Sequence, residues 1–192
     1  MLELGIDQGK EVQFQIDQAN DPRESGTETL IDAVSWFGQP TIEGRDKSEP
    51  TVWAIHSISP SGYDDVRFEK MVEGMLEHNI GLICCPSAAL SMRQLRPMIS
   101  PIHNSIARVL EMAEAGVRVR VGTDNICDIY IPNSDGNMLT EMKVLGTAVR
   151  FYVTNILAKW GAGIPLNEMD RDSIKKALDA DQSAFADLKL GK

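Results

Sequence analysis

The chain has 192 residues, of which 43% are hydrophobic, and it has a formal net charge of −9. These values fit one globular domain with a substantial core, and the acidic balance argues against nucleic acid as a partner. It contains neither an apolar run of membrane-spanning length nor a signal-peptide pattern, so we expect a soluble cytoplasmic protein with no membrane partner.

The first third of the chain predicts a helix, a strand, a second helix and a second strand. Residues 1–9 have a helical pattern that ends at a glycine, which is typical of a helix C-cap. Val12 to Asp17 alternates polar and apolar residues as a strand does, and Glu24 to Phe37 has apolar residues at helical spacing. The polar segment Gln39 to Pro50 predicts a loop, and Thr51 to His56 predicts a second strand.

The middle of the chain repeats this order. Asp64 or Asp65 can cap a helix that runs to His78, and the apolar run Ile80 to Cys85 predicts a third strand that Pro86 ends. A mixed polar and apolar stretch, Ser87 to Pro101, separates this strand from a helix predicted at about His103 to Ala115. Because Cys84 and Cys85 are adjacent, they point to opposite faces of a strand, and three cysteines cannot all pair within one chain. This favours a reducing compartment.

The last third of the chain supplies the fourth strand and its helices. Val117 to Gly122 predicts a strand with its valines on one face and Arg118 and Arg120 on the other. Met138 to Trp160 predicts one long helix, and about Asp170 to Ala186 predicts a final one. Four strands that alternate with helices imply parallel pairing through right-handed crossovers. The predicted fold is therefore α/β, with four successive βα units and an extra C-terminal helix.

Four βα units are half of a (β/α)₈ barrel, although they can also form a small open sheet covered on both faces. The glycine-rich phosphate loop of the open-sheet class is missing from the sequence. We expect a single partial domain over residues 1–192, with the half-barrel at about 10–160 and a helical extension at 161–192.

Polar side chains follow each predicted strand at its carboxyl end, where α/β enzymes commonly place their chemistry. They are Gln15, Asp17, Gln18, His56, Cys85, Ser87, Asp124, Asn125 and Asp128. His56 and Asp124 are the strongest candidates, because an imidazole and a carboxylate can hold a divalent metal or transfer a proton. The alternative for Asp124 is a structural role in a strand-to-loop turn, satisfied by backbone N–H groups.

The remaining polar candidates have structural explanations of at least equal weight. His78 and His103 fit helix-capping or surface positions, and the two cysteines at the third strand fit small core residues. Arg93 and Arg96 fit either a substrate contact or a solvated loop. The zinc-deaminase signature of H-x-E followed by P-C-x-x-C is absent, and so are a nucleophile elbow and a Walker-type loop.

Taken in order, the strand ends resemble the C-terminal half of the amidohydrolase superfamily, close to its cytosine-deaminase-like branch. Residues 14–30, which contain F-Q-I-D-Q-A-N-D-P-R-E and T-E-T-L, resemble the fifth barrel strand and helix of that family. W-A-I-H-S-I-S, which begins at residue 53, resembles the sixth strand. L-I-C-C-P-S, from residue 82, resembles the seventh, and V-G-T-D-N-I-C-D, from residue 121, resembles the eighth.

The resemblance implies a metal-dependent hydrolase that cleaves C–N bonds in cyclic amide, amidine or nucleobase-like small molecules. Asp124 matches the aspartate that contacts the metal and takes the proton from water, and His56 matches the strand-six histidine. By the same resemblance, Gln15 occupies the position of a metal ligand and Gln18 that of a catalytic acid. Asn125, Ser87 and Asp128 are expected to contact substrate, and the metal is expected to be zinc or iron.

The sequence also departs from the family. It has no H-x-H segment of a first barrel strand, and Gln15 replaces a histidine, although an amide is a poor ligand for zinc or iron. We therefore expect that this chain alone does not fully ligate a metal. Catalysis then requires completion of the barrel by a partner with the N-terminal half or by self-association into a homo-oligomer. The helical start at Met1 favours a truncated or split gene product. The alternative is an inactive half-barrel that self-associates or binds a small ligand.

Overall fold

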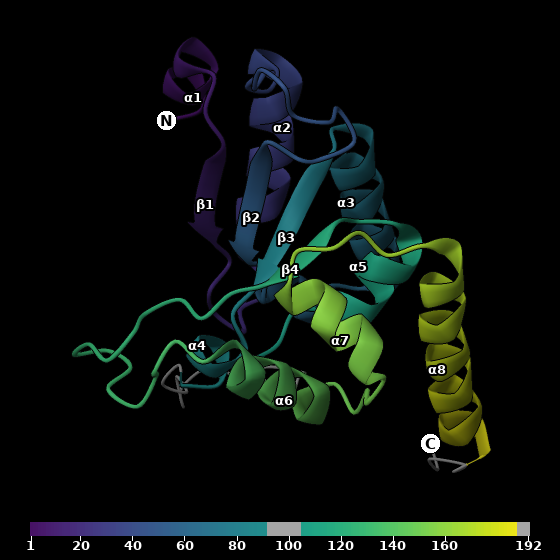
Figure 1. Cartoon of the computed structure of the whole chain (residues 1–192). Helices are drawn as coiled ribbons and strands as arrows, with labels where there is room; N and C mark the ends of the chain where they lie inside the picture. The colour runs from purple at the N-terminus through teal and green to yellow at the C-terminus, as the bar shows by residue number, and fades with distance from the viewer. Residues whose placement is uncertain (92–104, 188–192) are drawn as a thin grey trace.

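The computed structural model describes residues 1–91 and 105–187, and Figure 1 shows how the helices and strands are arranged. Four parallel strands form one sheet in the order β1-β2-β3-β4. They are β1 (Val12–Ile16), β2 (Val52–His56), β3 (Ile80–Cys84) and β4 (Val119–Val121). Because consecutive strands are neighbours and all run in one direction, the predicted class of successive βα units is confirmed.

Helices connect and flank these strands. They are α1 (Leu2–Gln8), α2 (Gly26–Phe37), the 3₁₀ turn η1 (Ser59–Gly62), α3 (Asp65–Glu77), α4 (Pro86–Ser91), α5 (Val109–Ala115), α6 (Met138–Ala148), α7 (Thr154–Gly161) and α8 (Glu168–Asp187). Figure 1 shows α2, α3 and α5 along one side of the sheet, and α8 packs against α5. In the described ranges, none of these helices has both the length and the apolar character needed to cross a membrane.

Three helix ends follow the predicted local chemistry. The carboxylate of Asp64 accepts a hydrogen bond of 2.8 Å from the backbone N–H of Arg67, which satisfies one of the free donors of the first turn of α3. Gly9 ends α1 in the left-handed region at φ 60°. His78 is the C-cap residue of α3, as its position in the sequence predicted.

The main core lies between the sheet and its helices. Side chains from β2 and β3 contribute Val52, Ala54 and Leu82, which are fully buried, and Met75 and Met112 pack on them from α3 and α5. The strand residues of opposite parity form the other face of the sheet. There Gln15, Ile55, Ile83 and Arg120 lie in register across the four strands, and none of them is fully buried.

Charged side chains occupy the amino-terminal end of this second face. Arg118 and Arg120 both pair with the carboxylate of Glu49, at 2.8 and 3.2 Å, and the guanidinium of Arg120 lies 4.1 Å from the ring centroid of Trp53. The Trp53 ring covers Gly81, where an added Cβ would lie 2.4 Å from ring carbons. The face is therefore polar at its edges, as the alternation in the fourth strand predicted.

The structure differs from the predicted elements at three places. The long helix predicted over Met138 to Trp160 is two helices, because Arg150 adopts a left-handed conformation at φ 53° and breaks the hydrogen-bond ladder. The chain turns there so that Phe151 is buried beside Trp160, with ring centroids 6.2 Å apart. The stretch after β3 contains a short helix, α4, that was not predicted. The helix α5 begins at Val109 and not near His103.

Candidate functional site

The two strongest candidates of the sequence, His56 and Asp124, lie together at the carboxyl ends of their strands. His56 is the last residue of β2, and Asp124 follows β4 by three residues. The Nε2 atom of His56 lies 3.7 Å from Oδ2 of Asp124, with the two side chains 3% and 14% exposed. That separation is longer than a hydrogen bond, so the two groups face each other without being joined directly.

The backbone reaches this arrangement through uncommon conformations. His56, Ser57 and Asp124 have positive φ values of 77°, 45° and 56°, and Asp17 at the end of β1 has 52°. Residues other than glycine rarely adopt such values, and each instance costs free energy that the surrounding structure must offset. The residues with these conformations lie at or just after the carboxyl ends of β1, β2 and β4, at one edge of the sheet. Strain of this kind is common at functional sites.

The imidazole of His56 is buried and unsatisfied. Neither of its ring nitrogens has a hydrogen-bond partner within the part of the chain that the structure describes. Burial lowers the pKa of His56 below its ordinary value, and the nearby Asp124 carboxylate offsets this effect only in part. The ring is therefore neutral near pH 7 and retains a nitrogen lone pair that can accept a proton, a hydrogen bond or a metal ion.

The lowered pKa of His56 gives a testable pH dependence of stability. Unfolded His56 takes up a proton at about pH 6.5, whereas the folded protein resists protonation until a lower pH. This contribution to stability is fully present above about pH 6.5, and it is lost as the pH falls from there toward the folded pKa. We expect the free energy of unfolding to decrease as the pH falls from about 6.5 to about 5.5, with a slope of at most about 1.4 kcal/mol per pH unit from this group.

Urea unfolding monitored at several pH values measures this dependence. The variant His56→Gln should show a flatter profile over the same interval. A wild-type profile no steeper than that of His56→Gln would show that the buried imidazole does not resist protonation.

The buried cysteine nearest the pair is a protonated thiol. Burial raises the pKa of Cys85, and neighbouring Cys84, Asp124 and Glu141 raise it further. Burial also raises the pKa of Cys84 to about 12. Cys84 belongs to the main core, whereas Cys85 packs on the opposite face with Ile55 and Ile83. Both therefore serve as small core residues on opposite faces, as predicted, and neither is poised as a nucleophile.

The donors at this site fall short of a complete metal site. In the ranges 1–91 and 105–187, no group of three or more His, Cys, Asp and Glu side chains is placed to hold an ion. Gln15 is exposed on the second face of the sheet, beside Ile55. His56 and Asp124 provide two donors, and a catalytic zinc site commonly needs three protein ligands. The described residues do not fit a resident catalytic metal.

The other predicted site residues lie outside the His56–Asp124 pair. Gln18 is half-buried in the loop after β1. Asn125 contacts the carboxylate of Asp128, whose Oδ1 accepts hydrogen bonds from the backbone N–H groups of Tyr130 and Ile131 at 2.9 and 2.8 Å. The backbone bonds lower the pKa of Asp128 and order the loop after β4. Arg93, Arg96 and His103 lie outside the described residues.

Ser87 is hydrogen-bonded to the buried carboxylate of Glu141, a residue that was not among the candidates predicted from the sequence. Its backbone N–H donates to Oε2 of Glu141 at 2.9 Å, and Glu141 is only 3% exposed. The signal was present in the sequence, since Glu141 falls between Met138 and Leu145 in the apolar stripe of its helix. An acid at a core-facing helix position predicts either a buried hydrogen bond or a ligand contact.

Asp17 is the second acid whose role the sequence left open. Its carboxylate accepts hydrogen bonds from the backbone N–H groups of Gly26 and Thr27, each at 2.7 Å, and from Oγ1 of Thr27 at 2.6 Å. Its backbone carbonyl accepts from the N–H of Ile58 at 2.7 Å. Asp17 therefore joins the end of β1 to the start of α2 and to the segment after β2, which supports the position of His56.

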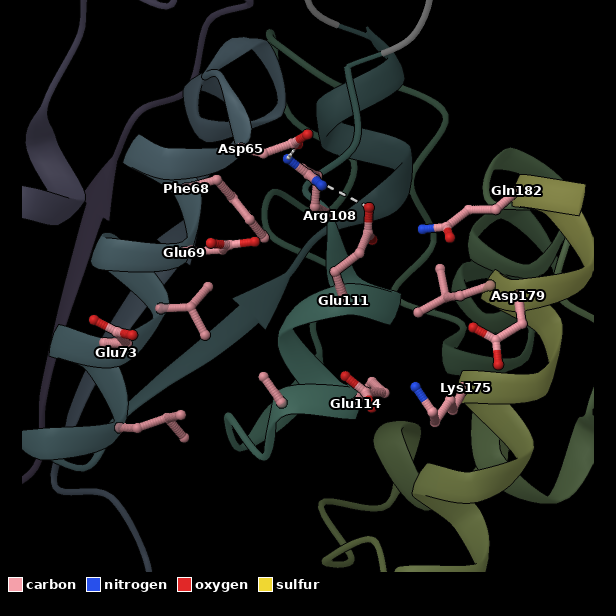
Figure 2. Close-up of a pocket in the computed structure, with 14 residues that line it drawn as sticks. Asp65, Phe68, Glu69, Glu73, Arg108, Glu111, Glu114, Lys175, Asp179 and Gln182 are labelled. Atoms are coloured by element: carbon pink, nitrogen blue, oxygen red, sulfur yellow. Dashed lines mark hydrogen bonds and ion pairs between the residues drawn. The ribbon is translucent and has the colours of Figure 1, made fainter. Parts of the chain in front are cut away.

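A further hollow of about 420 Å³ lies away from these residues, among α3, α5 and α8. Figure 2 shows Arg108 toward one end of it, between Asp65 and Glu111. The guanidinium of Arg108 lies 2.9 Å from the carboxylate of Glu111 and 3.6 Å from that of Asp65. This guanidinium also lies 3.8 Å from the ring centroid of Phe68. This hollow is lined by the outer helices, so it is separate from the carboxyl ends of the strands.

The fold and the position of the paired residues define a class of α/β protein that matches part of a (β/α)₈ barrel, with polar groups at the strand ends. Two solved structures of 5-methylcytosine deaminase from Klebsiella pneumoniae, liganded with 5-fluorocytosine and with phosphonocytosine, share this fold with a TM-score of 0.69. Each is 22% identical to this chain, and the match covers 83% of this chain and 37% of the deaminase. No family model and no curated protein matches the sequence.

Proposed function

We propose that this chain is part of a hydrolytic deaminase or amidohydrolase of the cytosine-deaminase-like kind, acting on C–N bonds of cyclic amide, amidine or nucleobase-like compounds. The observation that supports this most directly is the placement of a buried imidazole 3.7 Å from a carboxylate at the carboxyl ends of β2 and β4. The shared fold with 5-methylcytosine deaminase adds support, although the chain spans only 37% of that protein.

The chain's own contribution to such a reaction is a proton transfer. Asp124 is 14% exposed, so its carboxylate can reach a water molecule at the strand ends and accept its proton as the oxygen attacks the substrate carbon. The same proton can pass to the nitrogen that leaves, which balances the hydrolysis. His56, kept neutral by burial, borders the same space and can donate or accept a hydrogen bond there without adding a positive charge.

Such a site needs a second set of strands. β1 and β4 are the two end strands of the described sheet, and Gln13 and Gln15 are exposed on the face that a closed barrel would cover. We propose that a second copy completes the barrel. A two-fold axis along the barrel would pair β1 of each copy with β4 of the other, with all strands parallel.

This pairing would also address the shortage of donors. It would bring two copies of His56 and two of Asp124 to the same end of the barrel, and four donors would meet the ligand count that one chain does not reach. Zinc or iron would then be the expected metal. A partner chain that carries four other βα units is the alternative way to complete the barrel.

Light scattering, metal analysis and an ammonia-release assay test the proposal on the purified chain. We expect a dimer that retains near-stoichiometric zinc or iron per barrel and releases ammonia from cytosine or 5-methylcytosine, with specific activity that falls on dilution. A monomer that stays free of metal and inactive at every concentration would contradict completion by a second copy. A dimer without metal or activity would contradict the hydrolytic function.

An inactive half-barrel is the second candidate, and one observation favours it. The described residues bring no group of three or more ligating side chains together, and the amide of Gln15 stands where the resemblance expects a histidine. A chain of this kind would associate through its open edges without catalysis, and the metal analysis above separates it from the enzyme.

A further inference from the structure

A second pocket, of about 240 Å³, lies among α4, α6 and the loop that follows β4. Its wall contains the carboxylate of Glu141, the apolar side chain of Ile131 and five residues that carry a hydroxyl group: Ser87, Ser91, Tyr130, Ser134 and Thr140. The volume is below the usual range for drug-sized ligands, so it suits a molecule with few non-hydrogen atoms.

The carboxylate of Glu141 has unused hydrogen-bonding capacity. The structure gives it one hydrogen bond, from the backbone N–H of Ser87 to Oε2 at 2.9 Å, and the other oxygen, Oε1, accepts none from the described residues. A carboxylate that is 3% exposed is costly to bury with a single donor, because a buried charge is normally paired or bonded several times. The pocket is the space from which a partner could reach it.

Ser134 supplies a second, independent group with no partner. It lines the same pocket, is 7% exposed, and its Oγ is buried without a hydrogen-bond partner in the described part of the chain. Its backbone is already ordered, since its carbonyl accepts from the N–H of Cys127 at 2.7 Å. The hydroxyl is therefore a buried polar group whose hydrogen bond is not made within the described residues.

The charge of the lining decides the class of ligand. Among the described residues that line the pocket, Glu141 and Asp135 are the charged ones, and none is a lysine, arginine or histidine. Asp135 is exposed and its Oδ1 accepts from the backbone N–H of Asn137 at 2.9 Å, so Glu141 is the acid that lacks compensation. A planar cation with N–H donors satisfies a carboxylate through two parallel hydrogen bonds, whereas an anion would be repelled.

We propose that this pocket is a binding site for a small organic cation of the amidinium or guanidinium class. Glu141 is its counter-ion through Oε1, Ser134 is its second polar contact, and Ile131 packs against its apolar part. The site does not depend on the hydrolytic function, because neither His56 nor Asp124 lines it.

Titration of the full chain with benzamidine, followed by calorimetry and by backbone amide NMR, tests the site. Benzamidine should shift the amide signals of Ile131, Ser134 and Thr140, and the neutral isostere benzamide should bind at least tenfold more weakly. Glu141→Gln should weaken benzamidine binding by roughly tenfold or more, since a charge-assisted pair is replaced by a neutral bond. Its side-chain carbonyl can still accept from Ser87, so the fold should be kept.

Two controls keep the outcome interpretable. Glu114→Gln removes an acid from the separate hollow among α3, α5 and α8 and should leave the affinity unchanged. Ser134→Ala should weaken benzamidine binding several-fold without loss of folding. If the Glu141→Gln protein does not fold, Ser134→Ala becomes the variant that decides the test. Equal binding of benzamidine and benzamide, or shifts confined to α3, α5 and α8, would overturn the proposal.

Discussion

Replacing Asp124 by asparagine is expected to reduce ammonia release by about 10²- to 10⁴-fold, the range that loss of a general base commonly produces. The amide has the size of the carboxylate but cannot take a proton from water at neutral pH. The left-handed backbone of Asp124, at φ 56°, is well tolerated by asparagine, so the variant should introduce no new strain.

The assay compares the variant and the wild type as the assembled protein, with the temperature of thermal unfolding measured on the same samples. Glu114→Gln, on an outer helix, is the matched control and should keep full activity. An Asp124→Asn protein that remains active would show that the carboxylate only orders the turn after β4. A variant that is inactive because it unfolds early would point to the same structural role.

The order of strands and helices could be predicted because it depends on local pattern. Each strand alternates or is uniformly apolar, each following helix has apolar residues three and four apart, and parallel pairing follows from their alternation. The split between α6 and α7 could not be predicted in this way. Its turn occurs at Arg150, which is neither glycine nor proline. The backbone carbonyl of Gly146, inside α6, accepts a hydrogen bond of 2.9 Å from the N–H of Phe151, and burial of Phe151 beside Trp160 stabilises the turn.

The candidate site was also predictable only in part. The proximity of His56 and Asp124 could be predicted, because parallel strands bring their carboxyl ends to one edge of the sheet, and residues 68 positions apart in the numbering become neighbours there. The sequence could not give the neutral state of the imidazole, because that depends on burial by segments distant along the chain. It also could not connect Glu141 to Ser87, a hydrogen bond that joins α6 to α4. α4 itself was not predicted.

Replacing Asp17 by alanine is expected to lower the free energy of unfolding by about 3 kcal/mol, at roughly 1 kcal/mol for each hydrogen bond lost. The carboxylate serves as the cap of α2, since Ser25 at the N-cap position makes no side-chain capping bond and Asp17 accepts the N–H groups of Gly26 and Thr27. It also places negative charge at the positive end of the helix. Gly26 permits the approach, because an added Cβ would lie 2.9 Å from Oδ1 of Asp17.

Urea unfolding of three variants separates the capping role from ordinary surface effects. Asp46→Ala is the matched control: its exposed carboxylate also accepts a backbone N–H and a hydroxyl, both from Ser48, and its loss should change stability by no more than about 0.5 kcal/mol. Asp17→Asn should fall between the two, because one amide oxygen can still accept while the amide nitrogen faces donors. If Asp17→Ala costs no more than Asp46→Ala, the contacts among β1, α2 and the segment after β2 do not depend on this carboxylate. The backbone of His56 would then have to be held in its left-handed conformation by packing alone.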